Sequence, residues 1–435
     1  MSLRFIEGAA GTGKTTELFG QLERELSQTP LGELEHVLAL TKMHGSRRRM
    51  EERLRSIGGL RGRYRCWTAD SFAWRIVRRW RSLARRTSTQ ELGEEDYAQV
   101  CSLAGDLLSD PNVAEWVRRT FPIVVVDEFQ DCKGGQVAML ASLAEFCTCI
   151  VAGDVYLDLE ELGVNQAIAW ARENGEITSL SGNHRTLVPK LLSASQAIRA
   201  GQEVPENGGG FTALPAHNHN VGASFVSRNL TWWRGAADIA VLTPSRCPFV
   251  RDLLARVAER EFPNKHGGFG PHKIPWEESQ EEAREGFIER LGLPADGTEV
   301  SVDDLSLDDA GGPMDGLRGW FEKQARLAGR TGFTSEEIRL EAHRIHQRSR
   351  AYRRVKNGGV RAMTIHQAKN REFHSVIVLW PYKVAGDDER RRRLLYNAIS
   401  RARQQVLVVV QGPRRLQEPP FVATARSSPA SRTLF

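Results

Sequence analysis

The sequence lacks the features that would place it in a membrane or outside the cell. Across its 435 residues no apolar run approaches the roughly 20 residues that a membrane-spanning helix needs. The first residues have the character of a strand and do not show the pattern of a secretory signal peptide. We therefore expect a cytoplasmic protein.

Cysteine is scarce and scattered. There are six, mostly in apolar runs, and their spacing fits neither a disulfide framework nor a zinc site. We expect reduced core residues. Two nearby histidines, His217 and His219, have no other candidate ligands beside them, so no metal site is expected there.

The remaining composition is that of an ordinary globular protein with a small excess of positive charge. Hydrophobic residues make up 40% and charged residues 26%, and the net charge is +6. The length allows two to four domains. The arginine excess is compatible with a polyanionic partner and does not by itself establish one.

A glycine-rich stretch near the N-terminus is the clearest chemical motif. Residues 8–16, GAAGTGKTT, match the phosphate-binding loop G-x-x-x-x-G-K-[ST] and lie between a strand-like run at 3–7 and a helical pattern at 17–26. In such loops backbone N–H groups surround phosphates, the lysine contacts the outer phosphates, and the hydroxyl after it binds Mg²⁺. A chance glycine-rich turn would not need this order of strand, loop and helix. We predict nucleotide contacts from Gly8, Ala9, Ala10, Gly11, Thr12, Gly13, Lys14, Thr15 and Thr16.

Two acids follow a buried strand in residues 121–131, FPIVVVDEFQD. That end of a strand is where α/β proteins bind ligands. Asp127 is placed to hold Mg²⁺ together with Thr15, and Glu128 to orient and deprotonate an attacking water. Acids after a strand are often helix caps, but together with the phosphate loop this pair predicts hydrolysis.

Strand-like runs alternate with helical patterns, which predicts an α/β fold with parallel sheets and helices on both faces. These runs are 37–41, 123–126, 149–152, 177–180, 238–243, 360–364, 376–379 and 406–410. A Gly-, Pro- and Asn-rich break divides them into two sets. We predict an N-terminal domain (1–200) with a small insertion at about 76–118, a linker (201–235), a C-terminal domain (236–261 and 356–413), an accessory insertion (262–355) and a flexible tail (414–435).

Motifs in a fixed order make the chain resemble superfamily 1 helicases of the UvrD/PcrA/Rep type. DEFQD (127–131) resembles the family's D-E-x-Q-D, and TIHQAKNREF (364–373) resembles T-x-H-x-x-K-G-x-E-F. The other blocks, besides the phosphate loop, are ALT with RRMEERL (39–54), TADSF (68–72), AGD (152–154), LSGNHRT (180–186), DIAVLTPSR (238–246) and LYNAISRA (395–402). One block is a weak signal, but eight in the family's order are not.

The resemblance implies two RecA-like P-loop NTPase domains with ATP between them and single-stranded nucleic acid across their tops. By matching position, Arg185 and Arg401 contact the γ-phosphate from the two domains, and Glu372 contacts the ribose. Gln130 and His184 are further nucleotide-binding candidates. The implied cofactors are ATP and Mg²⁺. The candidates for nucleic-acid contacts are Thr41, Lys42, Trp67, Thr68, Ser71, Phe72 and His366.

The chain departs from the family at several positions. Leu157 stands where relatives carry a glutamine that senses the γ-phosphate, and Lys42 where they carry a stacking aromatic. His184 replaces a tyrosine that stacks on the base, and Asn370 replaces a glycine. Only seven residues precede Gly8, where relatives have an adenine-reading glutamine upstream of the loop, so we expect adenine selectivity to come from elsewhere or to be relaxed.

The segment 61–86 offers another route to nucleic acid. It holds nine arginines, a single acid and five aromatic residues. Arginines bind phosphates and aromatics stack on bases. However, Phe72, Ile76 and Leu83 with Ala73, Val77 and Trp80 fall at helical spacing, which favours a core face. The opposite face, with Arg75, Arg78 and Arg79, is either solvated or binds phosphate.

The function favoured by these motifs is a DNA-stimulated ATPase that moves along single-stranded DNA, with RNA as an alternative. By resemblance it moves 3′ to 5′ in DNA repair or anti-phage defence, beside a separately encoded nuclease, since no nuclease motif occurs here. The competing hypothesis is an NTP-binding switch or scaffold that regulates such a partner without unwinding. A small-molecule kinase would leave the last 250 or so residues unexplained.

Overall fold

The computed structural model describes residues 2–42, 44–88, 96–159, 164–233, 235, 238–264, 267–278, 280–295, 297–302, 305, 313–352 and 359–423. These residues form two compact units. One comprises residues 1–276 and 358–435, and the other comprises residues 277–357.

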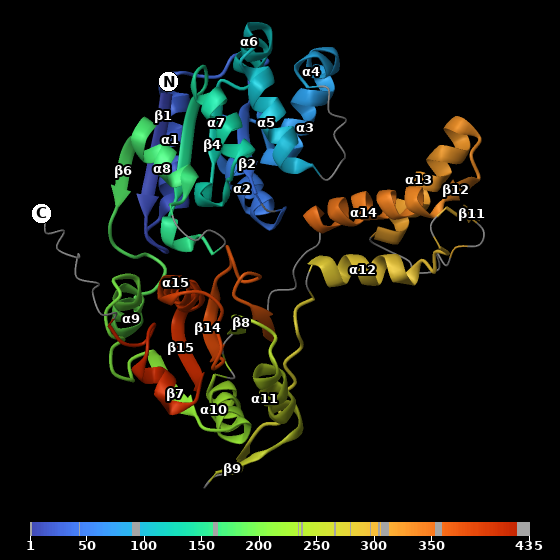
Figure 1. Cartoon of the computed structure of the whole chain (residues 1–435). Helices are drawn as coiled ribbons and strands as arrows, with labels where there is room; N and C mark the ends of the chain where they lie inside the picture. Colours follow the sequence, from blue (N-terminus) through green and yellow to red (C-terminus); the bar gives the residue numbers. More distant parts are fainter. Residues whose placement is uncertain are drawn as a thin grey trace, which may run out of the picture. The chain divides into compact units, whose positions relative to one another are not determined.

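The larger unit contains a six-stranded sheet whose paired strands are all parallel (Figure 1). Its order is β3-β2-β4-β5-β1-β6. The strands are β1 (Ser2–Gly8), β2 (Val37–Thr41), β3 (Tyr64–Thr68), β4 (Ile123–Val126), β5 (Thr148–Gly153) and β6 (Glu176–Leu180). Because parallel strands end at one edge, the blocks after β1, β2, β3, β4, β5 and β6 meet there.

Helices cover both faces of this sheet, because successive residues of each strand point to opposite sides. Val37 and Ala39 pack with α1 and α2, whereas Leu38 and Leu40 pack with α3, α5 and α7. The helices are α1 (Lys14–Gln28), α2 (His44–Ser56), α3 (Ala69–Arg79), α4 (Arg81–Thr87), α5 (Tyr97–Leu108), α6 (Pro111–Thr120), α7 (Gly135–Ala144) and α8 (Gln166–Asn174).

A second sheet of five strands, again parallel, has the order β13-β8-β14-β15-β7. Its strands are β7 (Phe211–Ala216), β8 (Asp238–Thr243), β13 (Gly359–Thr364), β14 (Phe373–Trp380) and β15 (Ala402–Gln411). Helices α9 (Pro189–Arg199) and α15 (Asp388–Ile399) bury side chains on one face, and α10 (His219–Trp232) and α11 (Pro248–Glu259) on the other (Figure 1). Two parallel sheets with helices on both faces confirm the predicted α/β class. We refer to the parts built on the two sheets as the first and second domains.

Two predicted boundaries require correction. The stretch 201–235, predicted as a linker, contains β7, which pairs with β15, and α10. Pro215 hid this strand from the sequence pattern; β7 is an edge strand, the place in a sheet that tolerates proline. In addition α9, assigned above to the first domain, packs Leu191 and Ile198 into the core of the second sheet.

The start of the predicted flexible tail is also ordered. Residues Pro413–Gln417 form a short 3-10 helix, and Phe421 is buried against Trp380. Residues 424–435 lie outside the described part of the chain.

The smaller unit consists of helices α12 (Gln280–Arg290), α13 (Pro313–Ala328) and α14 (Ser335–Tyr352) with the short pair β11 (Glu299–Ser301) and β12 (Gly332–Thr334). It has its own core around Phe287, Leu317, Phe321 and Phe333. The first residues assigned above to the accessory insertion form a hairpin of β9 (Phe262–Asn264) and β10 (Gly267–Phe269). This hairpin belongs to the larger unit.

All six cysteines are free, and burial raises the pKa of the Cys66 and Cys147 thiols to about 12. Such thiols stay protonated, as expected for core residues. Within the described residues no helix is both long and apolar enough to cross a membrane.

Candidate active site

The phosphate loop joins β1 to α1 at the carboxyl edge of the first sheet. Gly11 and Gly13 have φ of +82° and +87°, which side chains rarely tolerate, and a Cβ on Gly11 would lie 2.8 Å from Asn183 Nδ2. Thr12 Oγ1 donates to the Ala9 carbonyl at 2.9 Å. No side chain caps the start of α1, so its first N–H groups remain available to an anion.

Lys14 is buried within this loop. Its Nζ donates to the Gly8 carbonyl at 2.9 Å and the Ala9 carbonyl at 3.0 Å. Burial lowers its pKa, while the nearby charges of Asp154 and Glu128 oppose that shift. The ammonium group therefore lies inside the loop, bonded to the backbone at its start.

The pKa values of two neighbouring acids after β4 are shifted in opposite directions. Thr15 Oγ1 donates to Asp127 Oδ2 at 3.0 Å, a hydroxyl and a carboxylate of the kind that Mg²⁺ prefers. Burial and the charge of Glu128 raise the pKa of Asp127 to about 6. For Glu128, burial is outweighed by Lys14, Gln130 and Arg401, so its pKa is lowered. Thr15 and Asp127 thus fit a magnesium ion, and the groups around Glu128 favour its ionised form.

Gln130 is fully buried and holds Glu128 in place. Its Nε2 donates to Glu128 Oε2 at 2.7 Å, and its Oε1 accepts the Asp154 N–H at 3.0 Å. Asn165, which the motifs did not single out, donates to the Gln130 carbonyl at 2.9 Å. The structure therefore gives Gln130 contacts within the protein that orient the acid, and shows no part of it exposed to a ligand.

Arg185 and Arg401 come from distant parts of the chain and meet near Glu128. Arg185 donates through Nε to Glu372 at 2.9 Å and through Nη1 to the Ser400 carbonyl at 2.7 Å. Arg401 is buried, with its Nε on the Asn397 carbonyl at 3.1 Å. Burial and the charge of Arg185 lower the Arg401 pKa to about 10, and Glu128 works in the opposite direction. The two arginines and the carboxylates of Glu128 and Glu372 thus share one site.

The nucleotide candidates beside the loop lie close to it. The His184 N–H donates to the Gly11 carbonyl at 2.7 Å, and its ring lies 3.4 Å from the position of a Cβ on Gly13. Glu372 accepts from Arg185 and from Arg403 Nη2 at 2.9 Å, and with these partners its pKa is lowered despite burial. Thr16 is exposed on the first turn of α1.

Sequence reasoning missed several residues of this site. Asn183 Nδ2 donates to the Ala10 carbonyl at 3.1 Å, and the Tyr396 hydroxyl accepts the Ala10 N–H at 2.9 Å. Arg49 of α2 interacts electrostatically with Glu372, Glu128 and Asp127. All three lie in blocks quoted above, but only tertiary contacts show what they touch.

The first-domain candidates for nucleic-acid contacts are mostly packed. Thr68 caps α3 by accepting the Ser71 N–H at 3.1 Å, and Thr41 is buried at the end of β2. Phe72 is 1% exposed and stacks with Trp67, so its ring belongs to the core. Lys42 is half-buried at the same sheet edge. Burial raises the pKa of Asp131, and the nearby charge of Lys42 works in the opposite direction.

The face of α3 opposite its core carries arginines stacked on tryptophans. Arg75 lies 4.2 Å from the Trp67 ring, and Arg79 lies 4.2 Å from the Trp116 ring. The core face is buried as predicted, with Ile76 1% exposed. The arginines of the other face are exposed.

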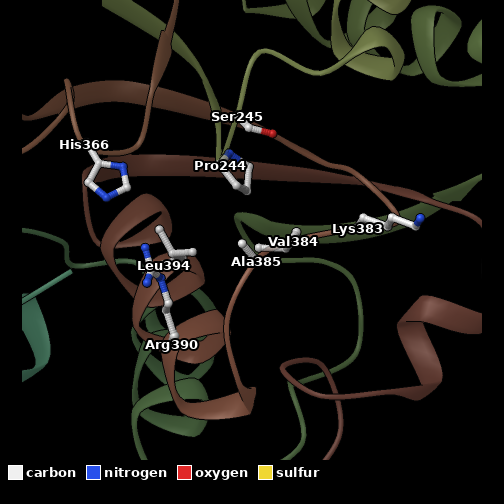
Figure 2. Close-up of a pocket in the computed structure, with 8 residues that line it drawn as sticks. All are labelled: Pro244, Ser245, His366, Lys383, Val384, Ala385, Arg390 and Leu394. Carbon is white, nitrogen blue, oxygen red and sulfur yellow. The ribbon is translucent and has the colours of Figure 1, made fainter. Parts of the chain in front are cut away.

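His366 lies apart from these residues, at a pocket of about 320 Å³ in the second domain (Figure 2). Arg390 and Leu394 of α15 face His366 and the loop that holds Pro244 and Ser245 (Figure 2). Lys383, Val384 and Ala385 complete the lining, which contains no acid.

Arg390 differs from the three arginines that follow it. Arg391 pairs with Asp388, and Arg392 and Arg393 pair with Glu389. In the described part of the chain no carboxylate pairs with Arg390, and its Nε is buried without a partner. Its side chain crosses Gly386 (φ +99°), where a Cβ would lie 2.3 Å from Arg390 Cδ. Among the described residues, the pocket therefore has a cation whose side chain forms no ion pair.

A family comparison covers the part of the second domain that contains Glu372 and Arg401. Residues 359–409 match the model of the UvrD-like helicase C-terminal domain. The chain resembles UvrD-type helicases. This confirms the resemblance inferred from the ordered motifs and indicates helicase-type activity. No curated protein matches the chain.

The UvrD-like segment contains His366, Lys369, Glu372, Tyr396 and Arg401. Lys369 Nζ reaches across to Asp131 Oδ1 at 2.5 Å. Asn370, which replaces the family's glycine, has φ +60°, a conformation that asparagine tolerates better than most residues. Asparagine is thus compatible with the left-handed backbone at this position.

Proposed function

We propose that this chain is an ATP-dependent translocase or helicase on single-stranded DNA. The observation that carries the proposal is the convergence of Lys14, Glu128, Arg185 and Arg401. Lys14 comes from the phosphate loop and Glu128 from the residues that follow β4. Arg185 lies between β6 and α9, and Arg401 directly follows α15. Each is a group that hydrolysis of a nucleoside triphosphate requires.

The roles follow from the geometry. Bound Mg²⁺ would neutralise charge developing on the phosphates, and Thr15 and Asp127 are the residues that would hold it. Glu128, kept ionised and oriented by Gln130, accepts a proton from the attacking water. Arg185 and Arg401 stabilise the transferred phosphoryl charge only when both domains contribute. Hydrolysis is thereby coupled to domain movement.

The pocket at His366 and Arg390 supports the nucleic-acid part of the proposal. An unpaired guanidinium attracts a phosphate, and the apolar wall of Pro244, Val384 and Leu394 suits the face of a base. From the resemblance alone we add 3′ to 5′ movement, a role in DNA repair or anti-phage defence, and a separately encoded nuclease as partner.

Steady-state ATPase measurements with and without a single-stranded oligonucleotide test this proposal. We expect hydrolysis that single-stranded DNA stimulates severalfold, and none in Lys14→Ala. A parallel series with RNA of the same sequence decides the nucleic-acid class. ATP binding without stimulated hydrolysis would contradict the motor and favour the switch or scaffold, a reading that the apolar side chain of Leu157 also suits.

A further inference from the structure

The phosphate loop is tied to the second domain by a tyrosine. The Ala10 N–H donates to the Tyr396 hydroxyl at 2.9 Å, and both residues are buried. Ala10 packs in the hydrophobic cluster of the second sheet, with Leu157 and Leu159 as its companions from the first domain. The start of the loop therefore belongs to the interface between the two domains.

An ion pair fixes the position of that hydroxyl. Arg199, at the end of α9, donates to Asp154 Oδ1 and Oδ2 at 2.8 and 2.9 Å, and its Nη1 lies 3.4 Å from Tyr396 Oη. Asp154 is 1% exposed and needs such a partner, because an unpaired buried carboxylate is strongly destabilising. The Arg199 guanidinium also lies over the rings of Tyr156 and Tyr396, at 4.9 and 5.4 Å.

The contacts of this cluster cross between the domains. Ala10, Asp154 and Tyr156 follow strands of the first sheet, whereas Arg199 and Tyr396 lie on helices packed on the second. Asn397 adds one more bond, from its Nδ2 to the Tyr156 carbonyl at 3.1 Å. Asp154 also influences Lys14 electrostatically, which links the cluster to the phosphate site.

We propose that Tyr396 is a positioning residue whose hydroxyl fastens the phosphate loop to the second domain, and that the Arg199–Asp154 ion pair holds this hydroxyl in place. When the domains open, water replaces the Tyr396 hydroxyl as the partner of the Ala10 N–H. The bond therefore favours the closed form, in which Arg401 of the same helical block faces Glu128. This inference rests on the proposed function for its effect on turnover, but the contact itself does not depend on it.

Amide hydrogen exchange resolved to single residues tests the contact in the full-length chain. In Tyr396→Phe, which removes only the hydroxyl, we expect the Ala10 amide to exchange about 2- to 10-fold faster, the range that corresponds to the net value of one hydrogen bond. The His184 amide, bonded to the Gly11 carbonyl, is the internal reference and keeps its rate. Tyr382→Phe is the matched control, because that tyrosine is 49% exposed and remote from the loop in its contacts. Unchanged exchange at Ala10 would overturn the proposal.

Steady-state ATPase kinetics on saturating single-stranded DNA then measure the effect of this bond on turnover. We expect Tyr396→Phe to lower kcat by about 2- to 10-fold with a smaller change in KM for ATP, and Tyr382→Phe to behave as wild type. Arg199→Met leaves Asp154 unpaired and should lower Tm, but at temperatures where the fold is intact it should add little to the loss of kcat in Tyr396→Phe, since the two groups act as one unit. Arg199→Lys should recover part of the loss. Losses of kcat that add in the double variant would mean that Arg199 acts through stability alone and would overturn the positioning role. If the wild-type chain shows no ATPase activity, the proposed function fails, while the exchange experiment still decides the contact.

Discussion

Lys14 and Glu128 lie in one site, and the proposed function assigns them contacts with different parts of a nucleotide. Lys14 lies within the phosphate loop, whereas Glu128 is held by Gln130 and is proposed to orient the attacking water. Glu128→Gln keeps the size of the side chain and an oxygen that accepts the Gln130 bond. The substitution removes the carboxylate charge and should therefore affect the chemical step alone.

We expect Glu128→Gln and Lys14→Ala both to abolish hydrolysis, and only Lys14→Ala to lose nucleotide affinity. Titration with a fluorescent ATP analogue in the presence of Mg²⁺ measures the affinity, and phosphate release measures the hydrolysis. Equal loss of nucleotide in the two variants would show that Glu128 contacts the ground state and that its assigned role is wrong.

The residues that meet around the phosphate loop were predictable where a local pattern encodes them. Gly8 to Thr16 and Asp127 with Glu128 are such cases, because the chemistry fixes their spacing along the chain. Tyr396 and Arg199 were not predictable as partners of Ala10 and Asp154. No local pattern records a contact between a loop at the N-terminus and a helix near the C-terminus.

Among the elements, α15 makes the sharpest prediction about nucleic acid. Arg390 and Arg391 are neighbours on one helix, but only Arg391 has a carboxylate partner, Asp388. A phosphate at the pocket would be bound by Arg390 and not by Arg391. The helix therefore contains its own control.

Arg390→Ala should weaken binding of a single-stranded oligonucleotide and reduce the slope of log K against log salt by about 1, the change expected when one phosphate contact is lost. Arg391→Ala should leave the slope as it is. Fluorescence anisotropy between roughly 50 and 200 mM salt measures both. Identical slopes in the two variants would remove Arg390 from the nucleic-acid interface.

Strands were predictable where they are buried and apolar. β2, β4 and β8 occur at the predicted bounds, because parallel strands covered on both faces are continuous hydrophobic runs. β3 and β7 were missed because each is interrupted by a residue that is unusual in a buried strand. Arg65 interrupts the first, so the arginine-rich segment hid it, and Pro215 interrupts the second, which lies at a sheet edge.

At the scale of the whole molecule, the proposed hydrolysis depends on the second domain completing the site of the first. Arg185 bonds the carbonyl of Ser400, the residue before Arg401, so the two arginines are structurally joined. Arg401 lies near Glu128 because the UvrD-like segment meets the first domain, and Arg185 lies beside Gly11 of the phosphate loop. Groups that act as a unit are strongly non-additive when removed.

The most direct test is steady-state ATPase on saturating single-stranded DNA for wild type, Arg185→Ala, Arg401→Ala and the double variant. We expect each single change to lower turnover by orders of magnitude, by analogy with the roughly 10³ to 10⁵ of an arginine finger, with smaller losses of nucleotide affinity. The double variant should be little worse than either single one. Near-wild-type turnover in Arg401→Ala would contradict the central claim, because it would show that hydrolysis needs no contribution from the second domain.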